Sequence, residues 1–430
     1  MLELFPRSAA VEGGVLSIGG VAVPALVAEH GSPLVVYCEE TLRAQARAYR
    51  EAAPDALLVY GSKAFPNLAL LRLFAEEGFG ADATTLGELE LARRAGIPGE
   101  RIVLHGNNKL DEELRAAAGL GALVAVDALD EIERAAAAGV RRALVRVTPG
   151  IEADTHEAIR TAHHGSKFGL PPDDVLTAVR ALQDAAVEVE GLHVHIGSQL
   201  LHLRAAAMTV EWLALFAARC RAELDWTPRV LDVGGGLGVA HVPEETPPSI
   251  ADFVATVAGE IERAWALERL EPPRLVLEPG RSLVGRAGVT VYTVGSVKRA
   301  SESTTYVAVD GGMSDNPRPA LYGARYGALL ANRADEPAAG GYAVAGRHCE
   351  SGDVLIERVE LPEPRRGDLL AVPATGAYTL AMASNYNAVP RPAAVLVAGG
   401  RARLIRRRET VDDLLALEVS LSLFRRRAML

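Results

Sequence analysis

Short apolar runs alternate with longer amphipathic segments between residues 57 and 285. Eight such runs lie at residues 57–61, 79–83, 101–105, 123–127, 143–147, 191–197, 229–236 and 274–280. The segments between them, such as 86–96 and 250–266, carry apolar residues at helical spacing. Alternation of strands and helices predicts βαβ units with a parallel sheet. Eight units of this length favour a (β/α)8 barrel, typically ~250 residues long, over an open doubly wound sheet.

The pattern of apolar and polar residues changes after about residue 286, where strand-like segments are separated by Gly and Pro turns with few helices between them. This pattern is typical of a mostly antiparallel β domain. The segment 11–37 has the same strand-like texture, so we expect it to join that domain in space. The predicted fold is therefore a TIM-type barrel of residues 38–285 and a discontinuous β domain of residues 1–37 and 286–430.

Composition narrows the class of protein. The 430 residues include 45 Lys and Arg against 55 Asp and Glu, a net charge of −10, which argues against nucleic acid as a partner. Cys38, Cys220 and Cys349 are far apart and form no CxxC pair, so neither a disulfide framework nor a zinc site is expected. The sequence has no signal peptide and no apolar stretch of ~18 residues, so we expect a cytoplasmic protein without a membrane span.

Barrel enzymes place their chemistry at the carboxyl ends of the strands. The predicted strand ends carry, in chain order, Lys63, Asp82, His105, Asp127, Arg146, His195 with Ser198, the glycines Gly234, Gly235 and Gly236, and Glu278 with Arg281. Lys63 follows the first apolar run in YGSKAF. A lysine is usually a solvated surface charge, but one at a barrel mouth is expected to be desolvated. Desolvation lowers its pKa and makes the neutral amine a nucleophile toward an aldehyde.

The three consecutive glycines follow the seventh run and could simply form a tight turn. Glycine backbone N–H groups can also approach a phosphate closely, and barrels often bind phosphate after strands seven and eight. Val239 occupies the last position of a would-be GxGxxG motif, so a dinucleotide fold is not indicated.

Three further features carry candidate chemistry. Glu278, in LEPGR, could be a surface acid or could hold a pyridine nitrogen protonated. Strand alternation points His193 and His195 to one face, where a ring could stack on a cofactor. Cys349 lies in the polar sequence HCESGD (348–353), where charged neighbours can tune a thiol for proton transfer.

Together these motifs resemble the diaminopimelate decarboxylases, of the alanine-racemase-like, fold-type III class of pyridoxal-phosphate enzymes. The resemblance covers essentially the whole chain. It rests on YGSKAF (60–65), HGNNK (105–109), THEAIRTAHHGSKFG (155–169), GLHVHIGSQ (191–199), LDVGGGLG (231–238), LEPGRSLVG (277–285), VDGGMSDNPRPALYG (309–323), HCESGD (348–353) and ATGAYTLAMASNYN (374–387).

The resemblance implies decarboxylation of meso-2,6-diaminopimelate to L-lysine with pyridoxal 5′-phosphate, held by Lys63 as a Schiff base. It implies that the cofactor is bound by Lys63, Asp82, His195, Ser198, Gly234, Gly235, Gly236, Glu278, Gly280, Arg281 and Tyr378. In this set His195 stacks on the ring, Glu278 pairs with the ring nitrogen, and the glycines hold the phosphate with Ser198 and Tyr378. It implies that the substrate is bound by Arg281, Arg318, Tyr322, Glu350 and Tyr378, with Cys349 as the proton donor. It also implies a homodimer in which HCESGD comes from the partner subunit.

Other functions stay open from the residues alone. A decarboxylase of ornithine, lysine or arginine is the nearest alternative, although Arg318 with Glu350 favours a substrate that carries both charges at its far end. A racemase is disfavoured, because it would need an Arg at the ring nitrogen in place of Glu278. A non-catalytic pyridoxal-phosphate-binding protein is the alternative from a different class, and the β domain with Cys349 argues against it.

Overall fold

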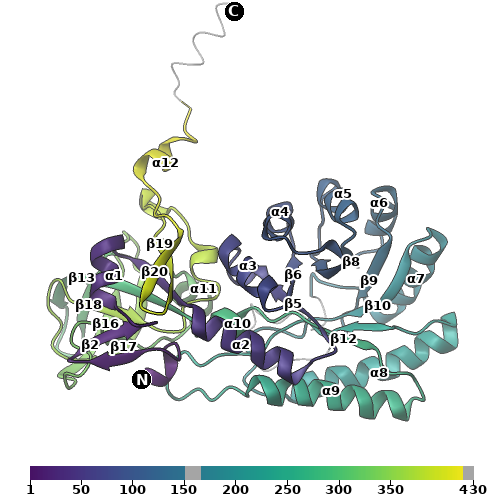
Figure 1. The fold of residues 1–430 in the computed structure, drawn as a ribbon, viewed down its shortest axis with the longest axis horizontal. Helices are drawn as coiled ribbons and strands as arrows, with labels where there is room; N and C mark the ends of the chain where they lie inside the picture. Colours follow the sequence, from purple (N-terminus) through teal and green to yellow (C-terminus); the bar gives the residue numbers. More distant parts are fainter. Residues whose placement is uncertain (151–165, 420–430) are drawn as a thin grey trace, which may run out of the picture.

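The computed structural model describes residues 1–150 and 166–419, and Figure 1 shows their arrangement as a barrel beside a second, sheet-rich domain. Residues 155–165 of the motif THEAIRTAHHGSKFG lie outside the described residues. Within the described part of the chain, no helix has the length and apolar character needed to cross a membrane.

Eight parallel strands form a closed barrel, as predicted. They are β5 (Leu57–Gly61), β6 (Gly80–Ala83), β7 (Ile102–Leu104), β8 (Leu123–Val126), β9 (Arg142–Arg146), β10 (Glu188–His193), β11 (Val230–Asp232) and β12 (Arg274–Leu277). Each strand pairs with its neighbour in the chain, and β12 pairs with β5 to close the ring. Because helices cover the outside and side chains fill the inside, these strands are apolar runs rather than alternating ones.

Helices surround the barrel (Figure 1). They are α2 (Glu39–Ala52), α3 (Leu68–Glu76), α4 (Leu86–Ala95), α5 (Asp111–Leu120), α6 (Glu131–Ala137), α7 (Pro172–Asp184), α8 (Arg204–Leu224) and α9 (Ile250–Leu267). Side-chain caps fix where several begin: Asn67 accepts two backbone N–H groups at the start of α3, and Ser249 forms a capping box at the start of α9. Gly96 ends α4 in the left-handed conformation that glycine adopts without strain.

The second domain is a nine-stranded, mostly antiparallel sheet, as predicted. Its strands are β4 (Leu34–Cys38), β13 (Gly288–Arg299), β14 (Thr305–Val309), β15 (Leu329–Leu330), β16 (Gly340–Ala345), β17 (Val354–Leu361), β18 (Leu369–Val372), β19 (Ala393–Ala398) and β20 (Arg401–Arg406). The N-terminal segment contributes β4, which lies between β13 and β19. Two pairings are parallel, β4 with β19 and β14 with β16.

The N-terminal segment is not all strand, although its pattern of apolar residues predicted strands. β1 (Ala10–Glu12), β2 (Val15–Ile18) and β3 (Val21–Ala22) form a small separate sheet. Residues Val23–His30 then form the helix α1, where we expected strand. Pro24 lies in its first turn, where the fixed φ of proline favours a helix start, and Val23 and Leu26 bury one face at i, i+3 spacing.

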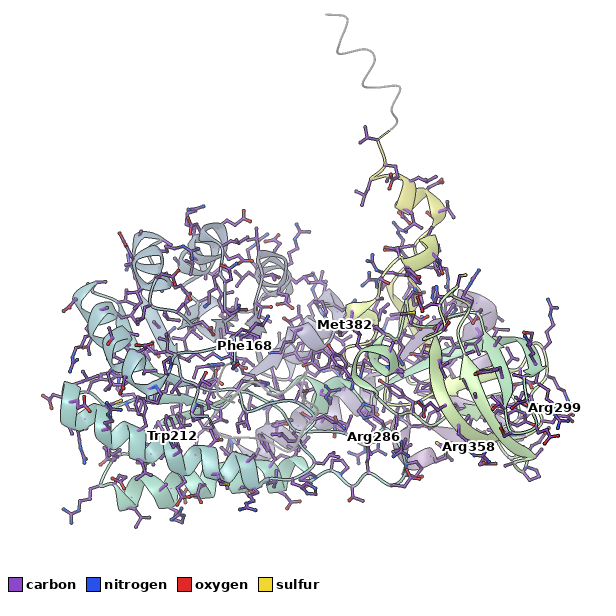
Figure 2. The ribbon with its side chains drawn as sticks, turned by 180° about the vertical axis from the view of Figure 1, so that it is seen from behind. Phe168, Trp212, Arg286, Arg299, Arg358 and Met382 are labelled. Atoms are coloured by element: carbon purple, nitrogen blue, oxygen red, sulfur yellow. The ribbon has the colours of Figure 1, made fainter. Side chains whose placement is uncertain are left out.

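The two domains meet in a tightly packed junction. Figure 2 labels Arg286 and Met382 there, between the barrel helices and the sheet, whereas Arg299 lies on the far side of the β domain. The Tyr37 hydroxyl donates a 2.8 Å hydrogen bond to the Gly376 carbonyl oxygen, and Gly376 N–H donates to the Gly285 carbonyl oxygen at 3.0 Å. A Cβ atom on Gly376 would overlap the carbonyl oxygen of Val284. The junction therefore requires glycine at this position.

We expect Gly376→Ala to destabilise the chain by ~1–3 kcal/mol, because backbone must move to admit the methyl group. Gly259→Ala is the control, since Gly259 lies exposed in α9 with open space around its Cα. That change should be neutral or stabilise by up to ~1 kcal/mol through helix propensity. Thermal melting of both variants checks the prediction, and equal melting temperatures would contradict it.

Candidate active site

Side-chain alternation along the barrel strands places an apolar layer beneath a polar one. Residues two apart on a strand share a face. The lower layer contains Leu57, Val59, Val103, Leu123, Ala125, Leu144 and Val276. Beyond it, toward the carboxyl ends, lie the buried polar side chains Asp82, His105, Asp127, Arg146, His193, Asp232 and Glu278. The carboxyl end of this barrel is therefore its chemical end, as in other barrel enzymes.

Lys63 lies in this polar layer, in the short turn Ser62–Ala64 that follows β5. Its Nζ is 3.4 Å from Asp82 Oδ2 and 3.4 Å from His105 Nε2. Burial acts to lower the pKa of Lys63, but the negative charges of Asp82 and Glu278 outweigh it and raise the pKa above its ordinary value. Our expectation of a lowered pKa was therefore wrong, because it considered desolvation without the carboxylates that face the amine.

The chain has four lysines, and their surroundings single out Lys63. Lys109 is the other buried one, and its Nζ lies 2.8 Å from Glu131 Oε1 with no side-chain exposure. Burial lowers the pKa of Lys109, but a paired amine closed off from solvent cannot meet an aldehyde. Lys167 and Lys298 are exposed. The Lys63 side chain is 34% exposed, so its amine lies among buried polar groups and can still be reached by a ligand.

Glu278 follows β12 and is buried across the pocket from Lys63. Burial raises its pKa, but His193, His105 and Lys63 together hold the pKa well below the ordinary value, so the group is a carboxylate. His193 Nε2 lies 3.3 Å from Oε1. Neither carboxylate oxygen accepts a hydrogen bond from a described residue. A buried charged acceptor of this kind suits a cationic N–H donor brought by a ligand.

The glycine loop after β11 lies between the ends of β10 and β12. A Cβ atom on Gly234 would overlap the His195 ring nitrogen, and one on Gly235 would overlap the Glu278 carbonyl oxygen. Gly234 and Gly236 also adopt positive φ angles of 70° and 96°. Gly235 N–H points to His195 Nδ1 at 3.4 Å. The loop is therefore a cradle of bare backbone, the form that phosphate sites use.

Tyr378 and Arg281 form the side of the pocket toward the β domain. Tyr378 has a φ of 58°, and its backbone N–H donates to the Ala64 carbonyl oxygen at 2.9 Å, which holds it beside the turn of Lys63. The Arg281 guanidinium lies 4.8 Å from the Tyr378 ring centre, and its Nη2 donates to Ser198 Oγ at 2.8 Å. Gly280 allows this approach, because a Cβ there would lie 3.3 Å from the Tyr378 hydroxyl oxygen.

A second cation, Arg318, lies near Arg281. It begins the short helix α11 (Arg318–Tyr322), which ends at Tyr322. Both arginines are buried, and burial together with the charge of Arg318 lowers the pKa of Arg281 to about 10. Arg281 Nε, Arg281 Nη1 and Arg318 Nε have no hydrogen-bond partner among the described residues. Two buried cations with unsatisfied donors form an anion site.

Cys349 and Glu350 lie apart from these groups. Both are exposed, and no described hydrogen bond or ion pair joins them to Lys63, Glu278 or Arg281. Their own anchors are local: Cys349 N–H donates to Asn387 Oδ1 at 3.1 Å, and the Tyr386 hydroxyl donates to Glu350 Oε2 at 3.5 Å. The described contacts link most of the other predicted site residues around Lys63, Glu278 and Arg281, and none of them links this pair to those groups.

Some residues of the site were missed or given no role from sequence. His105 and His193 were noted at strand ends, yet they contact Lys63 and Glu278 directly. Asp232 was not singled out at all, and it is fully buried beside Glu278. The sequence could have indicated Asp232 by its position two residues after Val230 on the same strand, because alternation points both side chains into the barrel.

Residues 39–285 match the family model described as "Pyridoxal-dependent decarboxylase, pyridoxal binding domain". The fold and the site therefore define a pyridoxal-phosphate-dependent decarboxylase of the barrel type. Diaminopimelate decarboxylase of Actinosynnema pretiosum is 47% identical over 97% of this chain and 95% of that protein. The one from Bacillus subtilis is 40% identical over 94% and 95%. The chain belongs to the diaminopimelate decarboxylase family.

Solved structures agree with this membership. Diaminopimelate decarboxylase from M. jannaschii in complex with L-lysine has a TM-score of 0.90 at 31% identity, over 97% of this chain and 99% of that one. Lysine/ornithine decarboxylase from Vibrio vulnificus with putrescine has a TM-score of 0.75 at 26% identity, over 87% and 97%. The cofactor of the class, pyridoxal phosphate, fits the residues present, since the Lys63 amine, the Glu278 carboxylate and the glycine cradle all lie at the carboxyl end of the barrel.

We expect Lys63→Ala to lose covalent retention of pyridoxal phosphate, because the other lysines are either paired in the interior or exposed. Borohydride reduction followed by peptide mass spectrometry measures this directly, and a chain with four lysines gives an unambiguous map. Lys298→Ala is the matched control and should retain the label. A reduced adduct on Lys109, or one that survives Lys63→Ala, would contradict the assignment.

Proposed function

We propose that this chain removes the carboxylate at one end of meso-2,6-diaminopimelate and yields L-lysine and CO2. The observation that carries the choice of substrate is the buried pair Arg281 and Arg318 at the edge of the lysine pocket. Such a pair is costly without an anion, and a second carboxylate on the substrate supplies one. The relatives named diaminopimelate decarboxylase support the same reading.

The chain's own residues prepare the pocket for this reaction. When bound, pyridoxal phosphate supplies a conjugated cationic ring that takes up the electrons left as CO2 departs. In our proposal Lys63 attaches the cofactor, and Asp82 with His105 holds that amine in place. Glu278 would accept a hydrogen bond from the ring nitrogen and so favour its protonated form, which is most valuable in the transition state.

The remaining cofactor contacts are assigned by position. His195 stacks on the ring, since it lies on the β10 side of the glycine loop. The loop of Gly234, Gly235 and Gly236 would form the cradle of the phosphate, with Ser198 and Tyr378 beside it. Arg281 is already hydrogen-bonded to Ser198, so it links the phosphate end of the pocket to the substrate end. Gly280 keeps the space for Tyr378 open.

Recognition of the substrate's far end is the basis of selectivity. We assign its carboxylate to Arg318, Arg281 and Tyr322, with Tyr378 alongside, and its ammonium to Glu350. A shorter or apolar substrate leaves these groups unpaired, and sites built on polar contacts reject such analogues by ~10⁴–10⁵-fold. Ornithine and lysine, the substrates in the name of the V. vulnificus protein, carry no second carboxylate to place beside two arginines.

We further propose a homodimer in which Cys349 and Glu350 complete the partner's site. Both side chains are exposed, and hydrogen bonds to Asn387 and Tyr386 hold their loop in place. No described hydrogen bond joins them to the site of their own chain, which supports a role in the partner's site. Cys349 then donates the proton that replaces CO2, a step for which a positioned acid is worth ~10²–10⁴-fold.

The domain division at 1–37 with 286–430 and 38–285 belongs to this proposal. The extent of the matched cofactor-binding domain, residues 39–285, supports it, and so do β4 and β13, which lie in the β-domain sheet. A cytoplasmic location is part of it too. Three free cysteines, one of them exposed, suit a reducing compartment.

Release of CO2 from diaminopimelate, ornithine, lysine and arginine, measured in parallel on purified protein, tests the substrate. We expect diaminopimelate to exceed the others by ~10⁴-fold in kcat/KM. Arg318→Leu should erase most of that preference while cofactor binding persists. Arg325→Leu is the control, because Arg325 is 70% exposed in the same region. Comparable rates on ornithine and diaminopimelate would refute the proposal.

Mixing Lys63→Ala chains with Cys349→Ala chains tests the shared site. Each variant alone should be nearly inactive, whereas random pairing should restore about a quarter of the wild-type sites, one in each mixed dimer. Mixing Lys63→Ala with the double variant is the control and should restore nothing. Absence of recovery in the first mixture, with dimers present by light scattering, would show that the thiol serves its own chain's site.

A further inference from the structure

Glu278 shares its buried position with a second acid. Asp232 ends β11 and His193 ends β10, the two strands that precede Glu278 around the barrel. One ligand atom from each of the three side chains lies within 4.8 Å of the other two. Asp232 and His193 have no exposed surface, and Glu278 is 4% exposed. Two carboxyl groups are thus confined with an imidazole in a dry space beneath the cofactor pocket.

Two carboxylates this close cannot both be ionised at low cost, so one holds a proton. The different surroundings of the two acids decide which one it is. His193, His105 and Lys63 all act on Glu278 and lower its pKa. Asp232 also lies near His193, but burial followed by the charge of Glu278, with Asp82 adding to them, raises its pKa well above the ordinary value. The proton therefore belongs to Asp232.

Hydrogen bonding agrees with that assignment. Asp232 Oδ1 accepts the Gly234 backbone N–H at 2.8 Å, which leaves Oδ2 to carry the hydrogen. Oδ2 has no partner among the described residues, and neither oxygen of Glu278 accepts a hydrogen bond from one. A neutral carboxylic acid can donate from one oxygen while it accepts at the other.

We propose that Asp232 is a positioning residue whose neutral carboxylic acid donates a hydrogen bond to Glu278 while it holds the first glycine of the phosphate loop. This inference rests on the proposed function, in which Glu278 meets the cofactor ring nitrogen. A donor on Glu278 makes that carboxylate less basic, so the shared proton stays on the ring. Asp232 thereby couples the ring end and the phosphate end of the pocket in one rigid unit.

The test compares Asp232→Asn with Asp232→Ala in the full-length chain. Asn keeps a neutral donor and an acceptor of the same shape, whereas Ala removes both. We expect Asp232→Ala to weaken pyridoxal phosphate binding about 10- to 100-fold in a spectrophotometric titration, as for loss of hydrogen bonds to a charged group. Asp232→Asn should stay within about threefold of wild type.

The second readout is the ¹⁵N chemical shift of the ring nitrogen in chains loaded with ¹⁵N-labelled cofactor. In Asp232→Ala it should move toward the unprotonated value, and in Asp232→Asn it should match wild type. A merely structural role would not move this shift. Thermal melting of the cofactor-free chains identifies any variant that fails to fold, and Asp232→Val then replaces Ala as the variant without hydrogen bonds.

Three results would overturn the inference. Equal loss of binding in Asn and Ala variants would mean that Asp232 acts as an anion. No loss in either variant would mean that it positions nothing. An unchanged ¹⁵N chemical shift of the ring nitrogen in Asp232→Ala would mean that Asp232 does not act on the ring through Glu278. If the proposed function itself were wrong, the borohydride-reduced cofactor adduct would survive the Lys63→Ala substitution. That result does not depend on the Asp232 variants, so the two failures can be told apart.

Discussion

A charge taken out of water needs a partner, and this constraint organises the whole barrel mouth. Some buried charges are satisfied within the chain: Lys109 pairs with Glu131 at 2.8 Å, and Arg146 lies 3.5 Å from Asp127. Others, chiefly Glu278 and the Arg281–Arg318 pair, keep unpartnered polar atoms among the described residues. The satisfied pairs hold the architecture, whereas the unsatisfied groups mark where a cofactor and a substrate with two carboxylates belong.

The fold was predictable because it depends on patterns that a sequence displays directly. Eight apolar runs correspond to β5 through β12, since strands buried on both faces read as continuous hydrophobic segments. The helix α1 was missed because eight residues with few polar positions fit either a strand or a helix. The parallel pairing of β4 with β19 joins opposite ends of the chain, and no local pattern can specify such a contact.

The site was predictable residue by residue, but its electrostatics were not. Strand ends located Lys63, Asp82 and Glu278 without any knowledge of distances. The direction of the Lys63 pKa shift depends instead on the carboxylates of Asp82 and Glu278, which come from different strands. Asp232 was missed for the same reason: a lone acid before three glycines acquires meaning only when a second acid is found on the neighbouring strand.

The same constraint bears on the proposed division of the site between two subunits. A thiol enclosed permanently with Lys63 and two arginines would lie against cations that favour its ionised form. Cys349 and Glu350 are held on an exposed loop, where Asn387 and Tyr386 orient them and solvent screens them. In the proposed homodimer a second chain would deliver this acid to the cations of the pocket, so that both subunits would be needed to complete one site.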